Sequence, residues 1–148
     1  MSIHALNFQT HNFIRSMWDD GLVNEQFVYL ETSRLHPLRR DALLRAVTVY
    51  TLSSKSLFSA ITIQLEQQQV DFERVSELVR DLYARSSSIG AERVKHACAE
   101  LIQASERKDK DYCSLALYWT KHRFSCLRGK FETLVKMERS ILNLENAQ

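Results

Sequence analysis

The sequence has few of the residues that interrupt helices. Only three Gly and one Pro occur among 148 residues, whereas charged residues make up 26% of the chain. Strand-and-turn architectures need more turn residues, so the composition favours a helix-rich protein. No apolar run approaches the roughly 20 residues that span a bilayer, and the first residues lack the basic start and apolar segment of a secretory signal. We therefore expect an intracellular protein that does not bind membranes.

Excess charge and paired cysteines are also lacking. The net charge is +2 and the basic residues are scattered among acids, so we expect no nucleic-acid partner. Cys98, Cys113 and Cys126 show no paired spacing, and isolated thiols are typical of a reducing compartment. The chain has no phosphate-binding loop, dinucleotide-binding glycine pattern or zinc motif, and we expect no cofactor.

Helical periodicity dominates the chain. It predicts helices over residues 3–18 and 23–34, a long third helix that begins at Pro37, a fourth capped by Asp71, a fifth after Gly90, and a long last helix. The residues expected to be buried in the last four helices are Leu43, Val47, Tyr50, Leu57, Ile61 and Leu65; Phe72, Val75, Val79 and Leu82; Ala91, Val94, Cys98 and Leu101; and Trp119, Phe124, Leu127, Phe131, Leu134 and Ile141.

Four amphipathic helices joined by short connections should pack as an antiparallel bundle. We predict an all-α fold, in which a four-helix bundle is accompanied by two additional N-terminal helices. The chain is long enough to bury one core, so residues 1–148 are expected to form a single domain.

The most specific pattern is VSELVRDLYARSSSIGA, residues 75–91. It resembles the active helix of plant histidine-containing phosphotransfer proteins, whose pattern is roughly H-x-x-K-G-S-S-x-S-I-G-A. Residues 65–72 and 131–134 resemble the family's turn before that helix and its C-terminal helix. The resemblance covers most of the chain and implies the same helical bundle.

In that family the His accepts a phosphoryl group from one receiver domain and passes it to another. The resemblance places Arg80 at the His, Tyr83 at the Lys, Ala84 at the Gly and Arg85 at a Ser of the pattern. The guanidinium of Arg80 stays protonated and has no lone pair to offer, so it cannot accept a phosphoryl group. A neutral Tyr83 and a larger Ala84 also change the surface around it. We therefore expect a protein without phosphotransfer activity.

The resemblance also implies a docking surface on the fourth helix. In the family this surface binds receiver domains, and the second and third helices contribute an apolar rim. On a helix, five of the residues concerned fall within an arc of about 100°, away from the apolar stripe. The predicted partner-binding residues are Ser76, Arg80, Tyr83, Ala84, Arg85 and Ser87. Helical geometry alone predicts only a solvated, charged face here.

The expected partners are receiver domains of hybrid histidine kinases and response regulators. We hypothesise that Arg80 pairs with the acidic cluster of a receiver. The resemblance implies a monomer of the cytosol and nucleus that competes with active phosphotransfer proteins in the cytokinin phosphorelay and dampens the response.

Two alternatives remain open from the sequence. The first alternative is an active phosphocarrier that uses a displaced His such as His96, and the second is a helical adaptor that binds no receiver. His122 and Cys126 have the spacing of half a metal site, but no second ligand pair is evident and we predict no metal. The serine run at residues 86–88 lacks a His or carboxylate network and is expected to end a helix.

Overall fold

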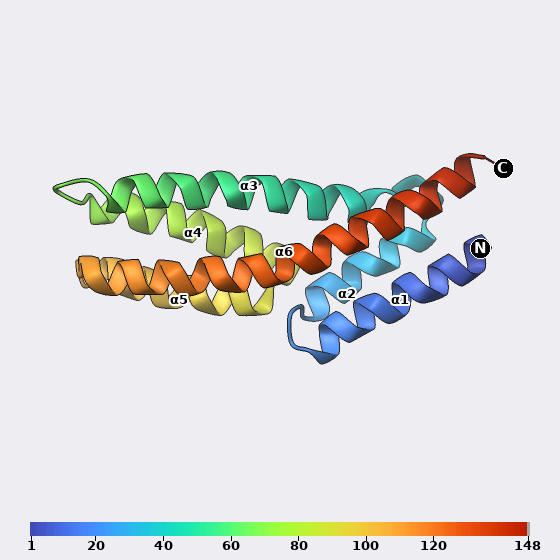
Figure 1. The fold of residues 1–148 in the computed structure, drawn as a ribbon, viewed down its shortest axis with the longest axis horizontal. Coiled ribbons are helices and arrows are strands. Elements are labelled where there is room, and N and C mark those ends of the chain that lie inside the picture. Colours follow the sequence, from blue (N-terminus) through green and yellow to red (C-terminus); the bar gives the residue numbers. More distant parts are fainter. Residues whose placement is uncertain (148) are drawn as a thin grey trace.

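The computed structural model describes residues 1–147, and of residue 37 it describes the backbone alone. Its helices are α1 (Ile3–Asp19), α2 (Glu25–Thr32), α3 (Ala42–Leu65), α4 (Phe72–Ile89), α5 (Glu92–Glu106) and α6 (Lys110–Asn146). Two 3₁₀ turns, Ser33–Leu35 and Pro37–Arg39, connect α2 to α3. No strand occurs in the described part of the chain, and the all-α prediction is confirmed (Figure 1).

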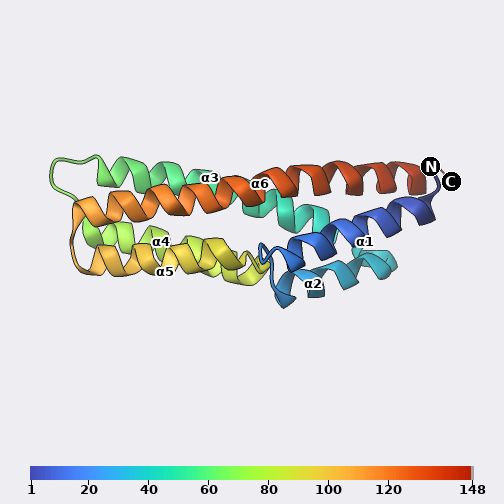
Figure 2. The same ribbon diagram turned by 60° about the horizontal axis from the view of Figure 1, so that its bottom comes forward.

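Helices α3 to α6 form the predicted antiparallel bundle. Around the bundle, α3 packs against α4, α4 against α5, α5 against α6, and α6 against α3. Helix α6 is much longer than its neighbours, and α1 runs beside its second half, with α2 close by (Figure 2). None of the helices in the described residues is long and apolar enough to cross a membrane.

Aromatic rings join the N-terminal helices to the bundle. The rings of Phe27 (α2) and Phe131 (α6) stack with centroids 5.3 Å apart. The ring of Tyr50 (α3) meets Phe131 and Phe124 edge-on, each at 6.1 Å. Such pairs contribute about 0.5–1.5 kcal/mol each beyond the apolar area that they bury. One continuous core therefore runs from α2 through α3 to α6.

The start of α4 follows from its capping residue. The carboxylate of Asp71 accepts a hydrogen bond from the backbone N–H of Arg74 at 3.1 Å, as predicted for an N-cap. The helix then buries one stripe and ends at Gly90, whose φ of +83° lies in the left-handed region.

Gly90 is also a point of close contact between segments. Its carbonyl accepts a hydrogen bond from the backbone N–H of Asn24 at 2.9 Å. A Cβ at Gly90 would lie 2.5 Å from Oδ1 of Asn24 and 2.7 Å from the backbone N of Phe27. The amide of Asn24 donates to the carboxylate of Glu92, which lowers the pKa of Glu92. The turn between α4 and α5 is thus held against the start of α2.

Two sequence-based predictions about the fold are wrong. The long third helix begins at Ala42 rather than at Pro37, because Pro37 opens a separate 3₁₀ turn in which the ring of His36 accepts from the N–H of Leu38. Trp119 is 48% exposed rather than in the core. The buried stripe of α6 passes through Thr120, whose hydroxyl bonds to the carbonyl of Ala116 at 2.7 Å and so needs no water. Leu57 and Phe72 are only partly buried at the edge of the core.

A buried ion pair ties α6 to the segment after α2. Nε of Arg34 lies 2.8 Å from Oε1 of Glu138, and both side chains are almost fully buried. The guanidinium also donates to the side-chain oxygen of Asn7 on α1. Burial raises the pKa of Glu138, while Arg34 acts in the opposite direction. The pair brings three separate segments of the chain together.

Gly90→Ala should lower the free energy of unfolding by about 2 kcal/mol or more, because Ala is strained at this φ and its Cβ meets backbone. Gly129→Ala is the matched control. Gly129 lies within α6, and a Cβ added there would meet no other part of the protein within 4 Å, so Ala should stabilise by up to about 1 kcal/mol. Urea denaturation measures both changes, and equal effects would contradict the role assigned to Gly90.

Arg34→Met should lower the free energy of unfolding at pH 7 by about 3 kcal/mol, because it leaves a buried carboxylate unpaired. The double variant Arg34→Met/Glu138→Leu should recover most of that loss. A carboxyl group whose pKa is higher in the folded than in the unfolded state destabilises the folded state at high pH, where the group is ionised. This destabilisation decreases as the pH falls below the folded-state pKa, and it is lost below the unfolded-state pKa. The deficit of Arg34→Met should therefore shrink between pH 7 and about 4.5. A deficit that does not change with pH would exclude Glu138 as its source.

Candidate functional site

The exposed side of α4 contains most of the predicted partner-binding residues. Helix α4 buries Val75, Leu78, Val79, Leu82, Ser86 and Ile89, and turns the opposite side to solvent. Arg80, Tyr83, Ala84 and Arg85 are exposed there. Ser76 and Ser87 are half-buried at the margin, so they are less accessible than helical geometry predicts. We call the exposed side with these six residues the α4 face.

Arg80 is held by contacts on two helices. Its Nε donates to the hydroxyl of Ser76 at 3.2 Å, one turn earlier on α4. One terminal nitrogen donates to Oε1 of Glu106, the last residue of α5, at 2.6 Å. The sequence did not suggest Glu106, because helical periodicity within α4 carries no information about a residue 26 positions away.

The ion pair between Arg80 and Glu106 is weak. Their side chains are 58% and 57% exposed, and pairs of this kind are worth at most about 1 kcal/mol. The guanidinium is therefore oriented but remains available. An incoming carboxylate can replace Glu106 at little cost in free energy.

An apolar groove lies beside the α4 face. It is lined by Leu30 of α2, Ala46, Val49 and Tyr50 of α3, and Arg85, Ser88 and Ile89 of α4. On α3, Val49 and Leu52 are exposed. Nε of Arg85 bonds to Asp81 at 2.8 Å along one edge. The α4 face therefore has Arg80 at its centre and an apolar flank, and both α2 and α3 contribute to that flank, as the family resemblance implies.

Of the serine run at residues 86–88, Ser86 is buried and packs on the inner side of α4. The hydroxyls of Ser86 and Tyr50 lie 2.8 Å apart and are buried. Burial raises the pKa of Tyr50, so its hydroxyl stays protonated. The hydroxyl oxygen of Ser87 is buried and has no partner in the part of the chain that the structure describes. With no imidazole beside them, these serines have no base to activate them.

The histidines lie away from the α4 face. Helix α4 contains none. Nε2 of His96 lies 2.8 Å from Glu92 on α5, and the ring lines a groove with Trp119 and Arg123 of α6. His11 pairs with Glu31 at 2.7 Å. Among the described residues, no imidazole lies beside Arg80 where it could act as the nucleophile.

The pair of His122 and Cys126, which has the spacing of half a metal site, has no further ligand nearby among the described residues. Nε2 of His122 lies 4.0 Å from Sγ of Cys126. Within residues 1–147, no three His, Cys, Asp or Glu side chains gather at one point. The other two thiols are buried, which raises the pKa of Cys98 to about 12 and that of Cys113 to about 11, so both stay protonated and unreactive.

Curated relatives match the chain along nearly its whole length. The chain is 32% identical over 141 residues to histidine-containing phosphotransfer protein 2 of Oryza sativa subsp. japonica, and the match covers 95% of both chains. It is 22% identical over 140 residues to pseudo histidine-containing phosphotransfer protein 6 of Arabidopsis thaliana, covering 94% of this chain and 90% of that one.

Solved structures give the same result. The X-ray structure of a rice histidine-containing phosphotransfer protein superposes with a TM-score of 0.89 at 32% sequence identity, covering 96% of this chain and 99% of that chain. No protein-family model matches the chain.

Proposed function

Because the chain belongs to the plant histidine-containing phosphotransfer family, we propose that it binds the receiver domains of two-component phosphorelay proteins without transferring phosphate. One observation carries this proposal. The residue at the family's phosphoryl-accepting position is Arg80, and it lies exposed at the centre of the α4 face.

Transfer requires a nucleophile that Arg80 does not provide. In a relay, a nitrogen lone pair attacks the phosphorus of an aspartyl phosphate, the P–O bond to the aspartyl carboxylate breaks, and the carboxylate leaves. The guanidinium has donors and no free lone pair. Tyr83 replaces a cation that would steady the phosphoryl charge, and Ala84 adds a methyl where the family pattern has Gly. Each change removes one contribution to transfer.

Binding requires less of the surface than transfer does. A receiver's phosphorylation pocket is acidic. Arg80 can leave Glu106 and pair with the carboxylates of that pocket at little cost in free energy. The apolar flank with Val49 and Leu52 supplies area to bury at the same time. Tyr83 adds an aromatic contact of the kind that anchors interfaces.

The cellular role follows from occupancy without transfer. A monomeric protein that covers receiver domains competes with active phosphotransfer proteins and dampens signalling. We place this role in the cytokinin phosphorelay, in the cytosol and nucleus, as the family resemblance implies.

Transfer and binding distinguish this proposal from its alternatives. A radiolabelled, phosphorylated receiver domain of a hybrid kinase should bind the unaltered protein and keep its label. Arg80→His should accept some label, and Arg80→His/Tyr83→Lys/Ala84→Gly should accept more. Acid-labile labelling of the unaltered protein would overturn the proposal in favour of another His. Absence of binding to a panel of receivers would leave the adaptor alternative.

Receiver affinity tests how Arg80 is used. Arg80→Glu should weaken binding at least about tenfold, since it places like charges together. Glu106→Gln should strengthen binding by up to about fivefold, because it releases a pair worth at most about 1 kcal/mol. Glu100→Gln, another exposed acid of α5 in a different groove, is the matched control. Isothermal titration calorimetry gives the affinities, and weaker binding by Glu106→Gln would show that Glu106 itself contacts the receiver.

A further inference from the structure

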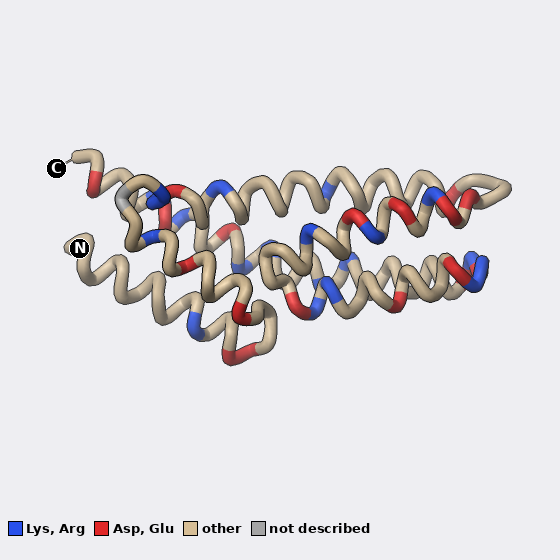
Figure 3. Tube along the Cα trace, turned by 180° about the vertical axis from the view of Figure 1, so that it is seen from behind, with Lys and Arg blue, Asp and Glu red and all other residues tan. Residues whose placement is uncertain are grey.

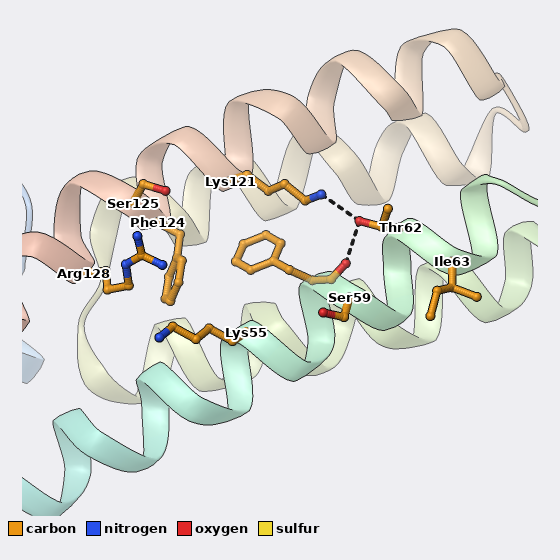
Figure 4. Close-up of a pocket in the computed structure, with 9 residues that line it drawn as sticks. Lys55, Ser59, Thr62, Ile63, Lys121, Phe124, Ser125 and Arg128 are labelled. Carbon is orange, nitrogen blue, oxygen red and sulfur yellow. Dashed lines mark hydrogen bonds between the residues drawn. The ribbon is translucent and has the colours of Figure 1, made fainter.

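A second groove lies between α3 and α6, formed by residues that do not belong to the α4 face. Figure 4 shows its two walls, which are Lys55, Phe58, Ser59, Thr62 and Ile63 on α3, and Lys121, Phe124, Ser125 and Arg128 on α6. On both helices the residues recur at intervals of three and four, so each wall is one continuous helix face. Phe58 and Phe124 are buried and form its floor.

The groove is cationic. Lys55, Lys121 and Arg128 line it together with three hydroxyl side chains and no carboxylate. Lys55 and Arg128 project from opposite walls near Phe124, and Nζ of Lys121 reaches across to the hydroxyl of Thr62 at 2.7 Å (Figure 4).

Few acidic side chains lie close enough to neutralise these positive charges. No acid of the described residues pairs with Lys55 or Lys121, and Nε of Arg128 is 3.7 Å from Glu132. Helix α3 carries two basic residues and no acidic one, as the almost uncoloured helix in Figure 3 shows. The other helices of the bundle show both basic and acidic residues in that view.

The charged surface continues along the bundle. An adjoining hollow shares Thr62 and Lys121 with the groove and adds Glu66, Lys110, Ser114 and Tyr118. At 100° per residue, Lys110, Lys121 and Arg128 fall within about 20° of one another on α6. They span about 18 residues, or about 27 Å, and a small anion cannot contact all three.

Exposed apolar side chains accompany the cations. Ile63 is 56% exposed and Tyr118 is 63% exposed, one from each wall of the continued groove. An extended surface with alternating cations and apolar contacts matches one face of an amphipathic helix.

We propose that the groove between α3 and α6 binds an acidic amphipathic helix of a partner protein. Lys121 and Arg128 are about 10 Å apart along α6, which equals the spacing of carboxylates at i and i+7 on a helix lying alongside. Lys110 pairs with a further carboxylate, which lies on the ligand helix eleven residues from the carboxylate that faces Lys121. The apolar residues of the ligand contact Ile63, Tyr118 and the floor. The inference does not depend on receiver binding, because it uses none of the α4 face.

The probe is a synthetic, fluorescein-labelled helical peptide of about 20 residues. It carries Glu at positions 1, 8 and 19, and Leu at positions 4, 5, 11 and 12. The control peptide has Gln in place of the three Glu. Fluorescence anisotropy should show binding of the Glu peptide that weakens with salt and is at least about tenfold tighter than binding of the Gln peptide. Equal binding of both peptides would overturn the proposal.

Charge-reversal variants locate the site. Lys121→Glu and Arg128→Glu should each weaken peptide binding about tenfold or more. Arg123→Glu is the matched control: it is an exposed cation of the same helix, about 160° from Lys121, and it lines the groove with Trp119. Its affinity should stay within about twofold of the unaltered protein. Circular dichroism and urea denaturation establish that each variant is folded.

Two further results would count against the groove. If Arg80→Glu weakens peptide binding as much as Lys121→Glu does, the peptide lies on the α4 face. Amide NMR shifts near Lys121 and Arg128 caused by inorganic phosphate, with none caused by the peptide, would identify a small-anion site instead. Peptide-induced shifts confined to the walls of the groove would support the proposal.

Discussion

The close contact between the turn at Gly90 and the start of α2 is the constraint on which the rest of the structure depends. The backbone of Asn24 bonds to the carbonyl of Gly90, and no Cβ fits between the two segments. This contact fixes where α4 ends and α5 begins. Together with the buried apolar stripe of α4, it sets how that helix lies against its neighbours and thus where Arg80 meets Glu106. It also brings Phe27 to the aromatic rings of α3 and α6.

Within residues 75–91, most residues that match the phosphotransfer pattern are buried, whereas the residues that depart from it are exposed. Of the residues that match the pattern, Ser86, Ile89, Gly90 and Ala91 are buried, Ser87 is half-buried and Ser88 is exposed. Arg80, Tyr83, Ala84 and Arg85 depart from it and are exposed. These buried matching residues therefore specify the fold, and their retention says nothing about catalysis. The chain thus keeps pattern residues that build the bundle, and it departs from the pattern at exposed positions of the α4 face.

Much of the fold followed from the sequence because it depends on local signals. The periodicity of α3 to α6, the Asp71 cap and the left-handed Gly90 each involve residues close together in the chain. The misplaced start of α3 and the exposed Trp119 arose where two local signals conflict: Pro37 suits a 3₁₀ turn as well as a helix, and a buried Thr120 satisfies its hydroxyl within α6. For the site, the positions on α4 were predictable, whereas the partner of Arg80 on α5 and the cationic groove between α3 and α6 were not. Both depend on contacts between helices, which periodicity within one helix does not encode.

The pairing of α1 with the second half of α6 has a consequence for how the chain matures. The bundle contacts join helices that follow one another in the chain, or its first and last members, and such local topology favours rapid folding. Helix α1, in contrast, is synthesised before the bundle, whereas its binding surface lies on α6, the last of these helices to leave the ribosome. Its apolar residues Ile14 and Met17 are therefore covered by α6 only after that helix has been synthesised. During that interval the apolar face of α1 is accessible to chaperones, proteases and self-association, although the same face is buried in the folded protein.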